Sequence, residues 1–138
     1  MQNSIFHCNR LVILLFILLI PIFSGCSGFM MGYTKDNAQN RYLLVDSSAE
    51  SLGYQRLRYM QDYRDSLSGF VREHGAPDFI YEYTTDEGRE GARLYYYRKN
   101  VTYIFEEATW RPSSFYLKNY RALTDYERQT YKQLKQDG

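Results

Sequence analysis

The chain has 138 residues, 17 basic and 16 acidic side chains, and a formal net charge of +1. A nucleic-acid-binding protein carries a basic stripe that meets phosphates, so this balance argues against a nucleic-acid partner. The length fits one domain once a targeting segment is set aside. All 15 tyrosines follow residue 25, beside a single tryptophan. Tyrosine is enriched at interfaces but also builds cores, so the excess predicts either a contact surface or an aromatic core.

The first 25 residues have the layout of a signal peptide. Arg10 precedes an apolar run from Leu11 to Phe23, which contains Pro21, and two small residues follow. A permanent membrane span needs about 20 apolar residues, and this run is shorter. We therefore predict that residues 1–25 are a signal peptide that is removed.

The sequence Phe23-Ser24-Gly25-Cys26 resembles the lipobox of bacterial lipoproteins, in which an apolar residue and two small ones precede a cysteine. Phe23 departs from the Leu that is usual there. The small residues let a peptidase hold the chain extended, and the thiol of Cys26 is the nucleophile that takes the lipid. The resemblance implies that the mature chain begins at Cys26 with several acyl chains, which stable anchoring requires. With Cys8 removed and Cys26 acylated, no disulfide is expected.

The residues after Cys26 bear on location and on the domain boundary. Ser27 follows the cysteine, and not the Asp that favours inner-membrane retention in enteric-type sorting. We therefore expect an outer-membrane lipoprotein that faces the periplasm, with the inner membrane as the alternative. Residues 26–40 are mostly Gly, Ser, Asn, Met, Lys and Asp without a period, which predicts a flexible tether. Residues 41–138 form the predicted domain.

The domain opens with a helical pattern. Ser47 and Glu50 have the spacing of a capping box, and apolar residues then recur at three- and four-residue steps. Residues 66–69 contain two serines and a glycine that can divide the segment, so one helix or a helix pair is expected. Gly75 is the predicted left-handed cap, and Pro77 prevents continuation.

Beyond Pro77 the residue pattern changes to the two-residue period of β-strands. Two other segments are less clear. The apolar stretch 42–45 is too short to classify, and residues 115–120 are interpreted as a further short strand or a connector. Thr124 and Glu127 form a second capping box before a last helix. The predicted fold is α+β, with an N-terminal helix or helix pair packed on a three-stranded antiparallel meander, and a C-terminal helix. The three predicted strands are residues 78–84, 92–99 and 101–107.

Patterns typical of enzymes are absent from the sequence. It contains no nucleophile elbow, phosphate loop or zinc-ligand spacing. His74 is interpreted as a solvated residue in the last turn of a helix. Asp78 and Glu82 share a face of the first predicted strand, which leaves a wall-active hydrolase as a hypothesis, but nothing supplies a second component. We expect no enzymatic activity, no cofactor and no metal ion.

The stretch 67–105 resembles the SmpA/OmlA (BamE-like) family of outer-membrane lipoproteins. Residues 70–78 look like that family's short helix ending in Leu-Gly-x-Pro, although His74 stands where Leu is usual. Residues 81–83 look like its first strand and residues 94–105 like its second hairpin. The C-terminal helix has no counterpart there. The resemblance implies a helix–helix–meander domain that supports a multiprotein envelope complex through its surface.

Two functions follow as expectations. The first is a non-enzymatic binding or assembly module for an outer-membrane or periplasmic complex, held by lipid on Cys26 beside an envelope protein partner. The alternative is a cell-wall glycan binder, in which aromatic rings stack on sugars. The sequence identifies neither the partner nor the oligomeric state. The residues predicted to form the contact surface are Tyr95, Tyr97, Trp110 and Tyr116.

Overall fold

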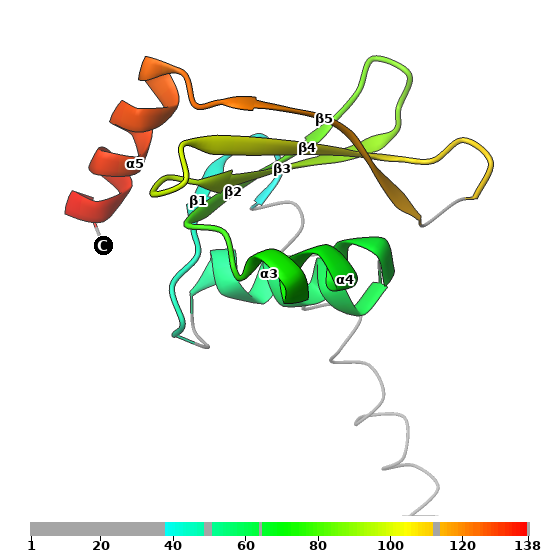
Figure 1. Cartoon of the computed structure of the whole chain (residues 1–138), viewed down its shortest axis with the longest axis horizontal. Helices are drawn as coiled ribbons and strands as arrows, with labels where there is room; N and C mark the ends of the chain where they lie inside the picture. The colour runs from blue at the N-terminus through cyan, green and yellow to red at the C-terminus, as the bar shows by residue number, and fades with distance from the viewer. Residues whose placement is uncertain (1–37, 49–50, 64, 112–113, 138) are drawn as a thin grey trace, which may run out of the picture. The chain divides into compact units, whose positions relative to one another are not determined.

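The computed structural model describes residues 38–48, 51–63, 65–111 and 114–137 (Figure 1). The predicted signal peptide, Cys26 and most of the predicted tether lie outside the described residues. All described residues belong to one unit of the chain, Thr34–Gly138. The elements in chain order are β1 (Tyr42–Leu44), α3 (Leu52–Tyr63), α4 (Asp65–His74), β2 (Phe79–Thr84), β3 (Glu90–Tyr96), β4 (Val101–Glu107), β5 (Phe115–Ala122) and α5 (Asp125–Asp137).

The strands form one antiparallel sheet in the order β1-β2-β3-β4-β5. The fold is α+β as predicted, but the prediction of a three-stranded meander is wrong, because β1 and β5 flank the three predicted strands. Strand β1 has only three residues, which is too few for a periodic pattern. Strand β5 contains the polar pair Lys118-Asn119, and a register shift between Ile104 and Phe105 interrupts its pairing with β4. A bulge of this kind breaks the alternation from which strands are recognised.

Both faces of the central strands are buried. Because side chains alternate along a strand, Ile80 and Leu94 point to one face while their neighbours Phe79 and Tyr95 point to the other. The first face packs against apolar residues of helices α3 and α4. The second face packs against Leu123 and the side of α5 that carries Tyr131 and Leu134. Figure 1 shows α3 and α4 along one side of the sheet and α5 at the end of β5.

The helix pair is delimited by local chemistry. Helix α3 begins after Ser51, whose Oγ accepts a hydrogen bond from the Tyr54 N–H at 3.5 Å, and not at the predicted Ser47 box. Helix α4 ends at the predicted cap, since Gly75 has φ +84° and its N–H donates to the Val71 carbonyl at 2.8 Å. Tyr96 Oη then donates to the Gly75 carbonyl at 2.7 Å, which fastens this helix end to β3.

The residues before β1 belong to the folded part of the chain. Ala38 is fully buried in the core on the helix-pair side. Gln39 forms a parallel bridge with Glu82, and the Asn40 N–H donates to the Glu82 carbonyl at 2.8 Å. The folded part therefore begins ahead of the boundary predicted at residue 41.

Helix α5 is anchored by one buried carboxylate, that of Glu127. The predicted capping box forms, with the Thr124 N–H donating to Glu127 Oε2 at 2.8 Å and the Glu127 N–H donating to Thr124 Oγ1 at 3.2 Å. Arg121 donates to both oxygens of the same carboxylate, at 2.8 and 2.6 Å. Burial raises the pKa of Glu127, but the hydrogen bonds from Arg121 and Thr124 outweigh it and hold the pKa below its ordinary value of 4.5.

We predict that Glu127→Gln destabilises the domain by about 2 kcal/mol at neutral pH, because Arg121 loses a charged bidentate partner. The pKa of Glu127 is lowered on folding, so its contribution is present above the ordinary pKa and is lost as pH falls through the folded-state value. Urea unfolding of both proteins at about pH 7 and about pH 3 measures this difference in stability, which shrinks in acid. Asp125→Asn, at a fully solvated carboxylate of the same helix turn, is the control and changes little. A difference independent of pH contradicts the assignment.

Candidate functional site

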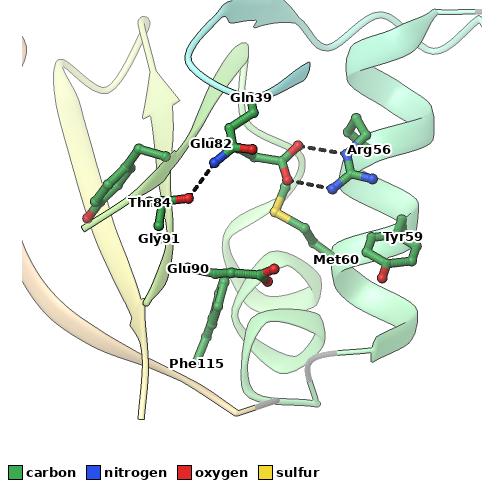
Figure 2. A pocket seen from close by; sticks show the side chains of 10 residues that line it. Gln39, Arg56, Tyr59, Met60, Glu82, Thr84, Glu90, Gly91 and Phe115 are labelled. Atoms are coloured by element: carbon green, nitrogen blue, oxygen red, sulfur yellow. Dashed lines mark hydrogen bonds and ion pairs between the residues drawn. The ribbon is translucent and has the colours of Figure 1, made fainter. Parts of the chain in front are cut away.

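A buried ion pair lies between α3 and the sheet (Figure 2). Arg56 donates from Nε to Glu82 Oε1 at 2.8 Å and from Nη2 to Glu82 Oε2 at 2.6 Å, and its side chain is 2% exposed. The helix reaches the sheet closely because Gly53 packs against β1, where an added Cβ would lie 2.1 Å from the Leu44 carbonyl oxygen. Arg56 is therefore drawn inward, where a charge is tolerated only with a well-placed partner.

The cavity beside this pair is too small for a ligand. It measures about 20 Å³ and is bounded by Arg56, Met60, Glu82 and Phe115, among others. This volume accommodates about one water molecule, whereas small-molecule sites occupy several hundred Å³. Figure 2 shows the side chains that line this space, with Gln39 bonded to Thr84 at its margin. The ion pair is therefore a structural contact between α3 and β2.

The two carboxylates of the hydrolase hypothesis do not meet. Asp78 accepts the Tyr97 N–H at 2.7 Å, whereas Glu82 is engaged by Arg56. Four residues of extended chain separate them by about 13 Å. Each carboxylate supports the fold through its own partner. The arrangement brings no acid and base to a common point.

The four aromatic residues predicted as a contact surface are divided between two places. Tyr95 is fully buried and stacks on Phe79 with ring centroids 4.2 Å apart. Tyr97 stacks on Tyr131 of α5 at 4.3 Å. Trp110 lies beside Tyr116 with centroids 5.5 Å apart. Because Tyr95 pairs with Thr102 near the start of β4 and Tyr116 pairs with Glu106 near its end, the four rings do not form one platform.

The sheet face opposite α3 and α4 is largely satisfied by its own contacts. The Arg93 guanidinium lies over the rings of Tyr81 and Tyr83, 5.6 and 5.0 Å from their centroids. Tyr83 Oη donates to Glu106 at 3.3 Å, and Lys118 donates to the same carboxylate at 2.8 Å. Burial, followed by the Glu106 charge, raises the pKa of Tyr83 to about 12, so the phenol stays neutral. These half-buried side chains are held by one another.

An aromatic surface that the sequence analysis did not predict lies where α4 meets β5. Tyr120 and Leu117 are 66% and 43% exposed, and they share the face of β5 that borders the helix. Tyr103 lies 6.1 Å from Tyr120, and Phe70 lies 4.7 Å from Tyr103, measured between ring centroids. His74 stacks on Phe70 at 4.0 Å. We call Phe70, His74, Tyr103, Leu117 and Tyr120 the α4–β5 surface.

The signal for this surface was present in the sequence but ambiguous. Leu117 and Tyr120 fall in the segment interpreted as a strand or a connector, and the bulge at Lys118 places them on the same face although they are three residues apart. His74, interpreted as a solvated helix-end residue, is half-buried, and its Nδ1 lies 3.2 Å from the Phe70 carbonyl oxygen. Its role here is to pack against the ring of Phe70.

The chain matches no family model, no curated protein and no solved structure. The resemblance to the SmpA/OmlA family therefore stays a prediction. Within residues 38–48, 51–63, 65–111 and 114–137, no helix has the length and apolar character needed to cross a membrane. In that same part of the chain, no group of three His, Cys, Asp or Glu side chains is arranged to hold a metal ion.

We predict that Arg56→Met destabilises the domain by about 3 kcal/mol, because it leaves the Glu82 carboxylate unpaired at the helix–sheet contact. The double variant Arg56→Met with Glu82→Met costs less than Arg56→Met alone, since no buried charge is then left without a partner. Urea unfolding of the unmodified protein, of the single variants Arg56→Met and Glu82→Met, and of the double variant measures these free energies. Glu87→Gln breaks the solvated Arg89–Glu87 pair and serves as a near-neutral control. Additive losses from the two Met substitutions contradict the pairing.

Proposed function

We propose that this protein is a lipid-anchored lipoprotein of the bacterial envelope whose domain binds a protein partner and does not catalyse a reaction. The observation that carries the proposal is the α4–β5 surface, with exposed Tyr120 and Leu117 continuous with Tyr103 and Phe70. Aromatic side chains at the centre of an interface supply much of its binding energy. The surface is suited to an apolar segment of another protein.

The position of this surface on the sheet favours recognition by side chains. Strand β5 is the last strand of the sheet in the described part of the chain, so it pairs with a strand on one side only, and Ser66 of α4 donates to its Phe115 carbonyl. Unpaired edges invite strand addition. The bulge at Lys118 and its exposed charge oppose indiscriminate pairing along that edge. The partner is therefore selected by the apolar side chains that flank the strand, on the side of α4.

The proposed lipid anchor determines where in the cell partner binding takes place. The segment Phe23-Ser24-Gly25-Cys26 supports lipid attachment at Cys26, and Ser27 favours delivery to the outer membrane with the domain in the periplasm. A domain held beside a membrane meets an envelope partner at high effective concentration, so a modest surface is sufficient. The proposed partner is accordingly a protein of the same membrane or of the periplasm next to it.

We predict that Tyr120→Ala weakens partner binding by about 2 kcal/mol, or roughly thirtyfold, because a central aromatic contact is removed. The matched control is Tyr126→Ala on α5, since the two tyrosines are 66% and 65% exposed. Co-purification from detergent-solubilised native membranes, with crosslinking, measures the amount of partner recovered. Equal loss from both variants argues against this surface. Recovery of the unmodified protein alone, under conditions that preserve other envelope complexes, overturns the binding function.

We predict that Cys26→Ser releases the protein from the membrane or leaves it uncleaved, because only the thiol can accept the lipid. Fractionation into soluble and membrane material, followed by mass measurement of the N-terminal peptide, distinguishes the two results. Cys8→Ser is the control and leaves both the anchor and the mass of the mature protein unchanged. Normal membrane extraction of the processed Cys26→Ser protein contradicts the lipid anchor.

A further inference from the structure

Trp110 is the most solvent-exposed large apolar side chain among the described residues. It is 75% exposed and belongs to the connection between β4 and β5. The stretch Ala108–Arg111 contains no acidic residue, and Arg111, which follows Trp110 in the chain, is exposed. The ring of Tyr116, near the start of β5, lies 5.5 Å from the indole between centroids. We call Ala108–Arg111 the Trp110 loop. An exposed indole next to a cation is the pairing found at membrane–water interfaces.

The Trp110 loop lies at the end of the sheet where the chain enters the domain. Register pairs Thr84 with Glu90 and Glu107 with Phe115, so the β2–β3 and β4–β5 connections share that end. Figure 1 shows both connections at the end of the sheet away from α5. Gln39 bonds to Thr84 at the same end, as Figure 2 shows. The residues that lead back toward Cys26 therefore join the domain at the same end of the sheet as the Trp110 loop, on the side of β2 that carries β1.

The length of chain between the proposed anchor and the domain keeps this loop near the bilayer. Residues 26–37 separate the lipid-bearing position from Ala38, and twelve residues span at most about 40 Å when fully extended. Gln39 pairs with β2 on the side away from β3, so about three strand spacings, or roughly 14 Å, separate it from β4. With Cys26 held in the membrane, Trp110 is thus within reach of the lipid headgroups.

Two backbone hydrogen bonds tie the Trp110 loop to Ser114. The Ala108 N–H donates to the Ser114 carbonyl at 2.7 Å, and the Ser114 N–H donates to the Arg111 carbonyl at 3.1 Å. Backbone that is already held at Ala108 and Arg111 loses less freedom when the loop binds. The covalent anchor raises the local lipid concentration, so one indole and one guanidinium are sufficient for a second contact.

We propose that the Trp110 loop is a second, non-covalent contact with the phospholipid bilayer, which sets the orientation of the domain on the membrane. This inference rests on the lipid anchor of the proposed function and adds a role for residues outside the α4–β5 surface. A bilayer is favoured over a glycan, because the indole lies at the end of the sheet where the anchored chain enters and only Tyr116 of the other predicted aromatic residues accompanies it.

The test uses the only tryptophan of the chain as its own probe. The processed, acylated protein is reconstituted into vesicles of phosphatidylethanolamine and phosphatidylglycerol, with or without lipids brominated near the headgroup end of the acyl chain. We expect the Trp110 emission to move to shorter wavelength in vesicles and to be quenched by the brominated lipid. The control carries Trp110→Phe with Tyr126→Trp, which moves the probe to α5 at the other end of the sheet. Its emission is unaffected by the bromines.

Flotation of the vesicles separates failure of this inference from failure of the anchor. Protein that floats but shows no quenching of Trp110 overturns the loop contact and leaves the anchor intact. Protein that does not float overturns the anchor and the loop contact together. A change in Trp110 emission caused by soluble peptidoglycan fragments, without quenching by brominated lipid, overturns the bilayer contact in favour of glycan binding. Equal quenching of both tryptophan positions also overturns it, because the domain then has no preferred orientation.

Discussion

The register between β2 and β3 is the constraint on which the rest of this domain depends. It sets Phe79 opposite Tyr95 and Ile80 opposite Leu94, and all four side chains are fully buried. Because neighbours along a strand point to opposite faces, both faces of the sheet need a cover. Helices α3 and α4 cover one face and α5 covers the other. A slip of one residue would exchange the two sets of side chains, so each helix fits only this register.

Two ion pairs attach the covering helices to the sheet, and each uses a bidentate guanidinium. Arg56 connects α3 to Glu82 on β2, and Arg121 on β5 holds Glu127 at the start of α5. Such pairs are directional, whereas apolar packing alone tolerates sliding. The charged residues with the least exposure therefore determine where the helices sit. They are not available to bind a partner or to catalyse a reaction.

Because both faces of the central strands are covered, the most exposed aromatic side chains lie at the margins of the sheet. Tyr95 and Tyr97 lie under or against α5, whereas Tyr120 and Trp110 are left to solvent. The first margin is the edge of β5 next to α4, and the second is the Trp110 loop, at the end of the sheet where the chain enters the domain. The proposed protein partner and the proposed bilayer contact would therefore use different sides of one small domain. Lipid on Cys26 would bring both into range.

The sequence by itself determined the features that depend on neighbours in the chain. Gly75 and Pro77 end a helix, Thr124 and Glu127 begin another, and three alternating strands lie between, because caps and periodicity are local. Only the tertiary structure decided that Tyr95 is buried and Tyr120 exposed, since the two differ in what packs over them and not in residue type. The tertiary structure also decided that β1 and β5 are strands of the sheet. Strand β1 is too short and β5 too irregular to be recognised without the strands that pair with them.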